Sequence, residues 1–489
     1  MLPDSFLSSE HHFNIHYTTR GKDSVSITDS NANFVPDRIE KIACAFEKSY
    51  SVECEQMRYQ LPPSMNNGSS SYDIYVIDLG NQYAVTKKYG FDSTLTVLKN
   101  VHSYILFDND FIGQGFHIQG ENAIKVTAAH EFFHAIQLGY VFRNTDGFFF
   151  ELTAVWMEDQ VFDEVDNYLY FLDYFFAAPD IPLNGVSYTI PGIFKHIYGS
   201  CIFGFYIAEN FGSDAIYQIW QLMPKMPALK AVDQVFKNYG TNFEKEFVKF
   251  CEWNFFTGNQ ALTNYSYKEA SQYPEVKLEK DEIVEYYFEE NNKGYFLTSA
   301  YFVLRPLKDG IYRVSFSTEF KDHWRLGLII WNKKIIKSYS IRPGETLKLE
   351  PIQQGEKIVA IPCNIDRFAN SSSIYFKEPP EEYTLILSKE RTLKEGTMKS
   401  FHIQDAYPNP FTGSISFVIT KVCDSNITVR IFNIKGRLID KVTISEQLQE
   451  VNHLNWNISS SKIKLASGIY FFQFSDGYFS ETEKVVLCL

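Results

Sequence analysis

The stretch "VTAAHEFFHAIQ", residues 126–137, carries His130 and His134 four positions apart, with Glu131 beside the first histidine. Residues four apart lie one turn apart on the same face of a helix, so both imidazoles can bind one metal ion. Glu131 is rotated by about 100° from His130, which suits a carboxylate that contacts a metal-bound water rather than the metal. The pattern predicts a zinc site on a helix.

Two histidines leave a catalytic zinc one protein ligand short, because such sites use three protein ligands and an open position for water. The segment "FFFELTAVWMEDQV", residues 148–161, offers two carboxylates on one side of a second predicted helix, Glu151 and Glu158. The small Ala154 between them permits close approach of the two helices. On the residues alone, either glutamate is a candidate for the third ligand.

The order H-E-x-x-H followed by E-x-x-A-x-W-x-E resembles the gluzincin metallopeptidases. The resemblance implies that Glu151 is the third zinc ligand. It makes Glu158 a residue that orients a ligand histidine, with the role of rival ligand left open.

Several further segments occur in an order similar to a family of bacterial metalloproteinases that are exported by the type IX system. They are "HFNIHYTT", "VPDRIEKIACAFE", "YDIYVIDL", "AAHEFFHAIQ", "ELTAVWMED", "YGSCIFGFYIAENFG" and "WNFFTG". This resemblance covers roughly residues 10–275 and implies an exported zinc-dependent endopeptidase. In such an enzyme Glu131 activates a zinc-bound water that hydrolyses a peptide bond of a protein or peptide substrate. The family is defined largely by sequence, so it does not supply a cleavage specificity.

A zinc peptidase also needs a donor for the oxyanion that forms during hydrolysis. Similar enzymes take it from a later helix, and "KHIYGSCIF" supplies His196 and Tyr198 in that region. Tyr198 is the preferred candidate, with His196 as the alternative. The strand predicted at Ser103–Asp110 is placed to act as a sheet edge that pairs with an extended peptide.

Alternating or helical patterns place the remaining elements of the first part. Strands are predicted at Phe13–Tyr17 and Tyr72–Leu79, with a helix from Pro36 to Tyr50 between them. A mainly helical stretch follows the histidine motif. The aromatic run Tyr168–Phe176 could line a pocket, although a core role is the more ordinary interpretation. The pattern indicates an α+β, zincin-like catalytic domain over residues 1–270.

Beyond Tyr273 the chain changes to short apolar runs separated by turns such as "KDG" and "RPGE". Strands at this spacing predict a β-sandwich over residues 271–395. Residues 396–489 are again all-β, and the alternation on both sides of Lys435-Gly436 predicts a hairpin. We therefore expect a multidomain chain with a catalytic domain followed by two all-β sandwich domains.

The motifs of the last segment are more specific than its fold. "YPNPF", "IFNIKGR", "SGIYF" and the terminal "KVVL" resemble the sorting domain of type IX secretion cargo from Bacteroidetes-like bacteria. The resemblance implies a type IX translocon as partner and a secreted or outer-membrane-attached location at the cell surface. The first residues, "MLPDSFLSSEHHF", show no basic and apolar regions of a secretory signal peptide, which such cargo requires.

Composition excludes other classes. The formal net charge is -13 and no basic cluster occurs, so we expect no nucleic-acid partner. No apolar run reaches the roughly 18 to 20 residues of a transmembrane helix, so no transmembrane segment is expected. The seven cysteines form no C-x-x-C pair, although a Cys44–Cys54 bridge is possible.

Two other functions fit the same sequence. The main rival is a non-enzymatic surface-binding or adhesion protein with a structural or vestigial zinc site. A second rival is an exopeptidase, which needs a charged group to hold a peptide terminus, and the sequence does not single one out.

Overall fold

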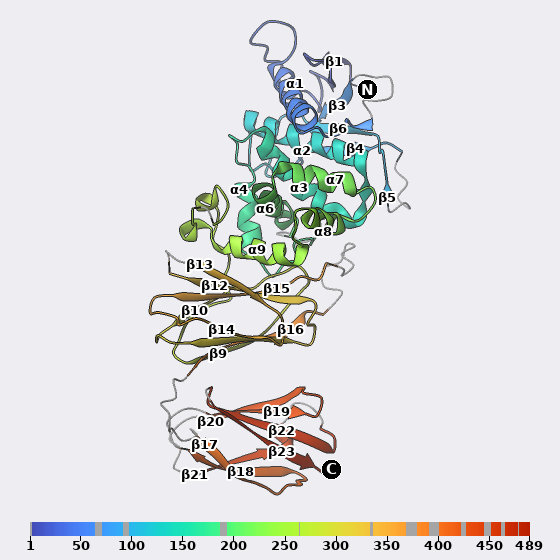
Figure 1. Ribbon diagram of the computed structural model, residues 1–489. Coiled ribbons are helices and arrows are strands. Elements are labelled where there is room, and N and C mark those ends of the chain that lie inside the picture. Colours follow the sequence, from blue (N-terminus) through green and yellow to red (C-terminus); the bar gives the residue numbers. More distant parts are fainter. Residues whose placement is uncertain are drawn as a thin grey trace.

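The computed structural model describes residues 2–63, 71–90, 97–185, 193–263, 265–332, 336–367, 379–390, 401–421, 427–444, 451–460, 465–477 and 479–489. Three parts follow one another along the molecule, from an N-terminal part with helices and a sheet, through a middle β-sandwich, to a C-terminal β-sandwich (Figure 1). The chain is thus multidomain, with an α/β region and two regions built from β-sheets.

A five-stranded mixed sheet lies at the N-terminal end of the molecule. In spatial order its strands are β1 (Asp4–Leu7), β2 (Phe13–Tyr17), β3 (Tyr72–Ile77), β6 (Ser103–Asp108) and β4 (Ala84–Lys88). Strands β2, β3 and β6 are parallel, whereas β1 and β4 run antiparallel to their neighbours. The strands predicted at Phe13–Tyr17 and Tyr72–Leu79 are confirmed. The prediction of an edge strand at Ser103–Asp110 is wrong, because β6 lies between β3 and β4, and β4 is the edge.

Helices α1 (Asp37–Tyr50) and α2 (Gly120–Tyr140) pack against this sheet. Phe13 of β2 contacts Phe46 of α1 and Phe132 of α2, with ring centroids 5.2 and 5.1 Å apart. On its other side α2 is covered as well, since Phe133 contacts Tyr59 at 5.0 Å. The aromatic pair between the two histidines therefore fixes α2 in the core from two directions.

The rest of the N-terminal part is helical. Its helices are α3 (Gly147–Val161), α4 (Leu169–Phe176), α5 (Ile193–Gly199), α6 (Cys201–Phe211), α7 (Ser213–Leu222), α8 (Ala228–Asn238) and α9 (Phe243–Phe255). Two short strands, β5 (Val97–Leu98) and β7 (Phe142–Arg143), pair beside α2. None of the helices in the described ranges has the length and hydropathy needed to cross a membrane. Cys44 and Cys54 are both free thiols.

Two sheets form the middle sandwich. One has the order β13-β12-β15-β10-β8, with β8 (Lys280–Val284), β10 (Phe302–Pro306), β12 (Trp324–Trp331), β13 (Ile336–Ile341) and β15 (Lys357–Asn364). The other has the order β14-β11-β16-β9, with β9 (Tyr287–Gly294), β11 (Tyr312–Thr318), β14 (Thr346–Lys348) and β16 (Glu381–Lys389).

Strand β12 is buried along its whole length because its sheet is covered on both faces. Leu326, Leu328 and Ile330 belong to the core between the two sheets. The alternate residues face α9, where Trp331 lies 5.9 Å from Phe255 between ring centroids. At Gly327 the approach is so close that a Cβ atom would lie 3.0 Å from Val248 of α9. The N-terminal part and the middle sandwich therefore share one core across α9 (Figure 1).

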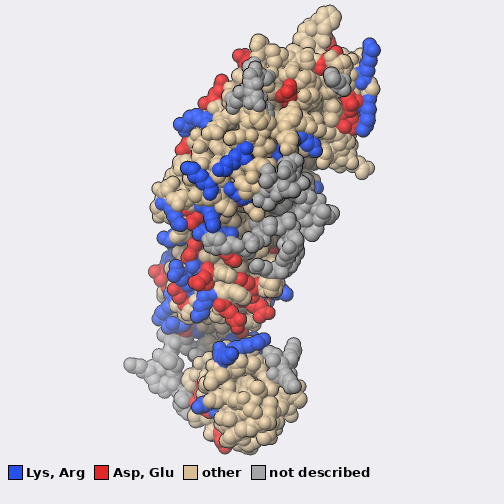
Figure 2. Space-filling model, turned by 90° about the vertical axis from the view of Figure 1, so that its right-hand side faces the viewer, with Lys and Arg blue, Asp and Glu red and all other residues tan. Residues whose placement is uncertain are grey.

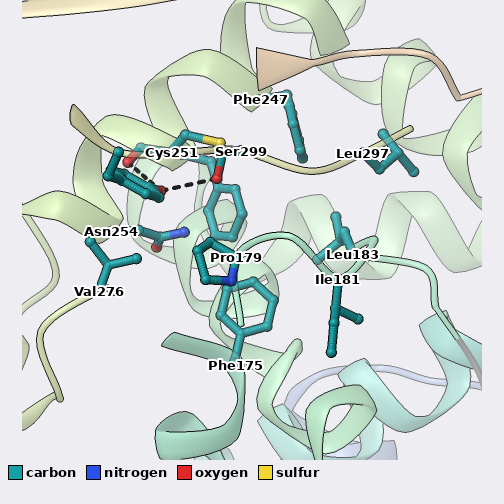
Figure 3. A pocket seen from close by; sticks show the side chains of 12 residues that line it. Phe175, Pro179, Ile181, Leu183, Phe247, Cys251, Asn254, Val276, Leu297 and Ser299 are labelled. Atoms are coloured by element: carbon teal, nitrogen blue, oxygen red, sulfur yellow. Dashed lines mark hydrogen bonds between the residues drawn. The ribbon is translucent and has the colours of Figure 1, made fainter. Parts of the chain in front are cut away.

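One small cavity of about 20 Å³ lies in this shared region, which is room for roughly one water molecule. Figure 3 shows its lining from the segment after α4, from α9 and from the chain before β10. Tyr301 donates a hydrogen bond to the carbonyl oxygen of Cys251 at 3.0 Å across it. The cavity marks close packing between the two parts and is separate from the histidine motif.

The C-terminal sandwich has a three-stranded sheet, β17-β18-β21, and a four-stranded sheet, β20-β19-β22-β23. Its strands are β17 (Phe401–Tyr407), β18 (Ser414–Lys421), β19 (Ile427–Asn433), β20 (Leu438–Ile444), β21 (Val451–Asn457), β22 (Gly468–Ser475) and β23 (Ser480–Leu487). The hairpin predicted at Lys435-Gly436 is confirmed by the β19–β20 pairing, and Gly436 has a φ of 77°. Arg430 of β19 forms an ion pair with Glu289 of β9, which connects this sandwich to the middle one.

The predicted domain boundary at 270/271 lies within a short 3-10 helix, Ala270–Gln272. This helix precedes β8, which is the first strand of the middle sandwich. The boundary at 395/396 lies outside the described residues. On the face seen in Figure 2, basic and acidic side chains are interspersed and are densest over the middle of the molecule.

We predict that Glu252 of α9 makes stability depend on pH. Burial raises the pKa of Glu252 to about 7, while the Ser338 hydroxyl donates to its Oε1 at 2.6 Å. Between pH 4.5 and about 7 the unfolded chain loses this proton and the folded chain keeps it, so the free energy of unfolding falls as pH rises. Glu252→Gln retains the acceptor and should recover up to roughly 3 kcal/mol above pH 7.

Thermal denaturation at pH 5 and pH 8 measures this effect. The gain in Tm of Glu252→Gln over wild type should be larger at pH 8 than at pH 5. Glu319→Gln, at an exposed carboxylate, serves as the matched control. An equal gain at both pH values would contradict the assignment.

Candidate metal centre

Helices α2 and α3 bring the predicted ligands together. Possible ligand atoms of His130, His134 and Glu151 all lie within 4.8 Å of one another. Glu151 Oε2 lies 3.3 Å from His130 Nε2 and 3.5 Å from His134 Nε2. The side chains are largely buried, and the imidazole rings are 4.6 Å apart and nearly perpendicular. Two nitrogens and one oxygen therefore point at a common position.

Gln137 fixes the distance between the two helices. Its Nε2 donates hydrogen bonds of 3.0 Å to the carbonyl oxygen of Phe150 and to the hydroxyl of Thr153, both on α3. Its Oε1 lies 2.7 Å from His134 Nδ1. Because Nδ1 is engaged in this way, the Nε2 atom of His134 is directed at Glu151. The fully buried Ala154 leaves the space for this close approach.

Glu158 contacts His130 at the ring nitrogen opposite the one that faces Glu151. Its Oε1 lies 2.7 Å from His130 Nδ1, on the side of the ring that faces away from Glu151. Asn167 donates to the other oxygen of Glu158 at 2.7 Å. Such carboxylate–histidine pairs fix the ring orientation of metal-binding histidines. The structure thus places Glu158 behind His130 rather than among the three converging atoms.

The electrostatics of the cluster favour a positive charge at its centre. Burial alone would lower the pKa of His130, but Glu151 and Glu158 outweigh burial and raise that pKa well above its usual value. Burial would raise the pKa of Glu151, whereas the charges of His134 and His130 lower it strongly. Among the described residues none donates a well-aligned hydrogen bond to the buried Glu151 Oε2.

These properties fit a zinc ion. Imidazole nitrogens and a carboxylate oxygen are ligands that zinc prefers, and two histidines with one glutamate form a known type of catalytic zinc site. A buried carboxylate oxygen without a donor, facing two imidazoles, is costly unless a cation or a proton lies between them. His130, His134 and Glu151 would hold the ion.

Glu131 is held beside this cluster by the edge strand. Thr86 of β4 donates to Glu131 Oε2 at 2.6 Å and to the Glu131 carbonyl oxygen at 2.9 Å. Among the described strands β4 pairs only with β6, so its other side, which lies toward Glu131, carries no described strand. The sequence predicted β6 as the strand beside the site, whereas the structure has its neighbour β4 there.

The two candidates for the oxyanion donor occupy different places. The ring of Tyr198 stacks at 5.9 Å on His130 and at 5.0 Å on Phe171. His196 is 1% exposed and stacks on Phe175 at 4.9 Å, and burial lowers its pKa to about 3. Tyr198 is thus adjacent to the metal cluster, whereas His196 lies in the core.

The aromatic run Tyr168–Phe176 divides between the two interpretations. Phe171, Leu172, Phe175 and Phe176 are buried in the N-terminal core. Tyr170 and Tyr174 are only half-buried and contact Lys195 of α5. The first group belongs to the core, whereas Tyr170 is partly buried and packs against it.

Three features of the structure were not predicted from the sequence. Thr86 lies in a short strand, "AVTKK", whose pattern is too weak to predict a strand. Gln137 follows the histidine motif at helical spacing, and its position could have suggested a contact with His134.

The third concerns residues 29–40, before and at the start of α1. Asp29, Asn31, Asn33, Asp37 and Glu40 have the oxygen-ligand spacing of twelve-residue calcium loops. At the position that is glycine in such loops, Phe34 has a φ of 70°. The amides of Asn31 and Asn33 donate to the Glu40 carboxylate. The spacing alone could have directed attention to this loop.

The chain belongs to a family of unknown function, DUF6055, whose model matches residues 7–318. The match runs through the N-terminal part to the end of β11, which agrees with the core that this part shares with the middle sandwich. Residues 405–488 match the secretion system C-terminal sorting domain. The chain is therefore marked for export by the type IX system to the cell surface or the extracellular space.

Other comparisons add little. No curated protein matches the chain. Solved structures that match include β-glucuronidases from Parabacteroides merdae at 8% identity and from Bacteroides uniformis at 13% identity. The matches cover 37% and 42% of this chain, and 29% and 27% of those enzymes, with TM-scores of 0.14. This chain thus spans less than a third of their length, and such TM-scores support no inference about fold or activity.

We predict that Glu158→Gln weakens zinc binding by about 10- to 100-fold without abolishing it. Glutamine keeps an acceptor for His130 Nδ1 but removes the negative charge that makes the imidazole a better ligand. Zinc affinity is measured by competition with a chelator. Asp159→Asn, at the next carboxylate of α3, is the control, because the hydrogen bond of Asp159 comes from Gln160 rather than from a ligand histidine. Wild-type affinity in Glu158→Gln would contradict this role.

Proposed function

We propose that this chain is an exported zinc-dependent endopeptidase of the gluzincin type. The observation that carries the proposal is the convergence of His130 Nε2, His134 Nε2 and Glu151 Oε2, with Glu131 held on the next face of α2. Three ligands and an adjacent carboxylate are what hydrolysis at a metal centre requires.

Each residue has a distinct role in the proposed reaction. Zinc, when bound, supplies a Lewis acid that polarises the scissile carbonyl and lowers the pKa of water to about 7. Glu131 takes a proton from the attacking water and delivers it to the leaving amine. Thr86 fixes the direction of the Glu131 carboxylate through its 2.6 Å hydrogen bond. Tyr198 donates a hydrogen bond from its hydroxyl to the oxyanion of the tetrahedral intermediate.

Strand β4 is the proposed binding site for the substrate backbone. The side of β4 that carries no described strand lies beside Glu131, so an extended peptide that pairs with β4 passes the reacting groups. Addition of a strand to a sheet edge uses main-chain hydrogen bonds and therefore accepts many sequences. This mode fits an endopeptidase, because it places no requirement on a chain end.

The rival hypothesis is a surface-binding protein in which zinc is structural. Structural zinc sites are closed by four protein ligands, whereas catalytic sites use three. Within the described part of the chain, the cluster contains three such residues. The ligand number therefore supports the catalytic hypothesis over the structural one.

Glu131→Gln tests the proposed function most simply. The variant should keep its zinc, because Glu131 is not among the converging ligands, and glutamine still accepts from Thr86. Its peptide hydrolysis should fall by about 100- to 10,000-fold, since the base is lost. Cleavage of a random decapeptide pool is followed by mass spectrometry, with Glu121→Gln at an exposed position of α2 as the control. Undiminished cleavage by Glu131→Gln would refute the mechanism.

Tyr198→Phe tests the oxyanion donor separately. Loss of one such donor typically lowers kcat by about 100- to 1000-fold. Phenylalanine preserves the stacking on His130 and Phe171, so zinc content and stability should not change. Unchanged kcat in the presence of full zinc would show that Tyr198 only packs against the ligand histidine.

A further inference from the structure

A lysine with two tyrosine partners lies near the candidate metal centre. Lys195 of α5 donates hydrogen bonds to the hydroxyls of Tyr170 and Tyr174 of α4, at 2.5 and 2.8 Å. Its Nζ also lies 4.8 and 4.6 Å from the centroids of the two rings. All three side chains are half-buried, so the cluster is open to solvent on one side.

The ammonium group of Lys195 has one hydrogen-bond donor that neither tyrosine uses. A lysine has three donors, and two of them are used by the phenol hydroxyls of Tyr170 and Tyr174. Among the described residues, the hydrogen-bond partners of Lys195 are the two tyrosine hydroxyls. The hydrogen bonds to the tyrosines raise the pKa of Lys195, so it carries its charge at neutral pH. The cluster therefore presents a cation without a described counter-charge.

Aromatic contacts connect this cluster to the metal ligands. The ring of Tyr198 stacks at 5.9 Å on His130, and Phe171 stacks at 5.0 Å on Tyr198. Phe171 in turn contacts Tyr170 with 5.3 Å between ring centroids. Lys195 also precedes Tyr198 by three residues on α5, which places both side chains on one face of that helix.

Polar contacts reach the same cluster by a second route. Glu158 bonds to His130, Asn167 donates to Glu158, and His117 Nε2 lies 2.9 Å from the Asn167 side-chain oxygen. The ring of His117 stacks on Tyr170 at 4.0 Å. One aromatic and one polar series of contacts thus connect His130 to Tyr170 of the lysine cluster.

The direction of β4 indicates on which side of the scissile bond the Lys195 cluster would contact a substrate. Thr86 of β4 contacts Glu131, and Tyr83, just before β4, contacts His117 at 5.8 Å. The cluster is therefore near the N-terminal end of β4. Antiparallel pairing is the more stable and more frequent arrangement. A substrate strand antiparallel to β4 would reach the cluster with residues on the C-terminal side of the scissile bond.

We propose that Lys195, with Tyr170 and Tyr174, forms a subsite for a carboxylate of the substrate on the C-terminal side of the scissile bond. The carboxylate comes either from an aspartate or glutamate side chain or from a free C-terminus. The ammonium group donates its third hydrogen bond to this carboxylate, and the tyrosine hydroxyls hold Nζ in place by accepting the other two. This inference rests on the proposed peptidase function, because it assigns a specificity to the same site.

The first test uses cleavage of random decapeptide pools with amidated C-termini, compared with the same pools as free acids. Wild type should favour Asp and Glu over Asn and Gln by about tenfold at one position C-terminal to the cleaved bond. Lys195→Met should lose this preference, and Lys195→Glu should shift it toward Lys and Arg. Lys225→Met, at an exposed lysine between α7 and α8, should retain it. A preference restricted to free acids at a fixed distance from the chain end would identify the terminal carboxylate as the source.

The second test does not need turnover. The same pools are dialysed against zinc-loaded Glu131→Gln protein, with and without Lys195→Met, and the retained peptides are sequenced. Enrichment of carboxylate-bearing peptides that Lys195→Met abolishes supports the subsite. Cleavage or retention that is the same with and without Lys195→Met overturns it and leaves the proposed function intact. If zinc-loaded wild type cleaves no peptide, the proposed function is refuted instead. The dialysis then still shows whether Lys195 is needed to bind carboxylate-bearing peptides.

Discussion

The contact between α2 and α3 is the constraint on which the rest of the N-terminal part depends. Two imidazoles one turn apart can meet a carboxylate from a second helix only if the helices approach closely and keep one register. Ala154 provides the space, and Gln137 provides the register through its bonds to the α3 backbone and to His134. Phe132 and Phe133 hold α2 between the sheet and the remaining helices. The polar cluster is thus built into a rigid apolar surrounding, which keeps its geometry fixed.

The same contact sets the electrostatics of the site. Glu151 and Glu158 lie on opposite sides of the His130 ring, and burial strengthens both interactions because the local dielectric is low. The N-terminal part is in turn supported by the middle sandwich, since α9 packs on β12 and both belong to one core. The family match that runs to residue 318 agrees with this dependence. The sorting domain is a separate sandwich with its own core.

Local patterns predicted the elements that carry the site, and long-range contacts explain what was missed. The spacing of His130 and His134 follows from helical periodicity alone, so the sequence was sufficient to place both on one face of a helix. The choice of Glu151 over Glu158 came from the gluzincin resemblance, because the register of α3 on α2 is a non-local contact. The order of strands in the sheet depends on non-local pairing. An alternating strand such as β6 has the same pattern at an edge or inside a sheet, whereas β4 has lysines and little alternation. Likewise, the apolar run in β12 predicted a strand, but it did not reveal that α9 covers its second face.

The central claim is that His130, His134 and Glu151 bind one zinc ion. It is tested most directly by measuring zinc per chain in the purified protein and in the variants His130→Ala and Glu151→Ala. Circular dichroism shows whether both variants are folded. The account predicts about one zinc per chain in wild type and its loss in both variants. Wild type that holds no zinc after refilling with the metal, or Glu151→Ala that retains it fully, would contradict the account.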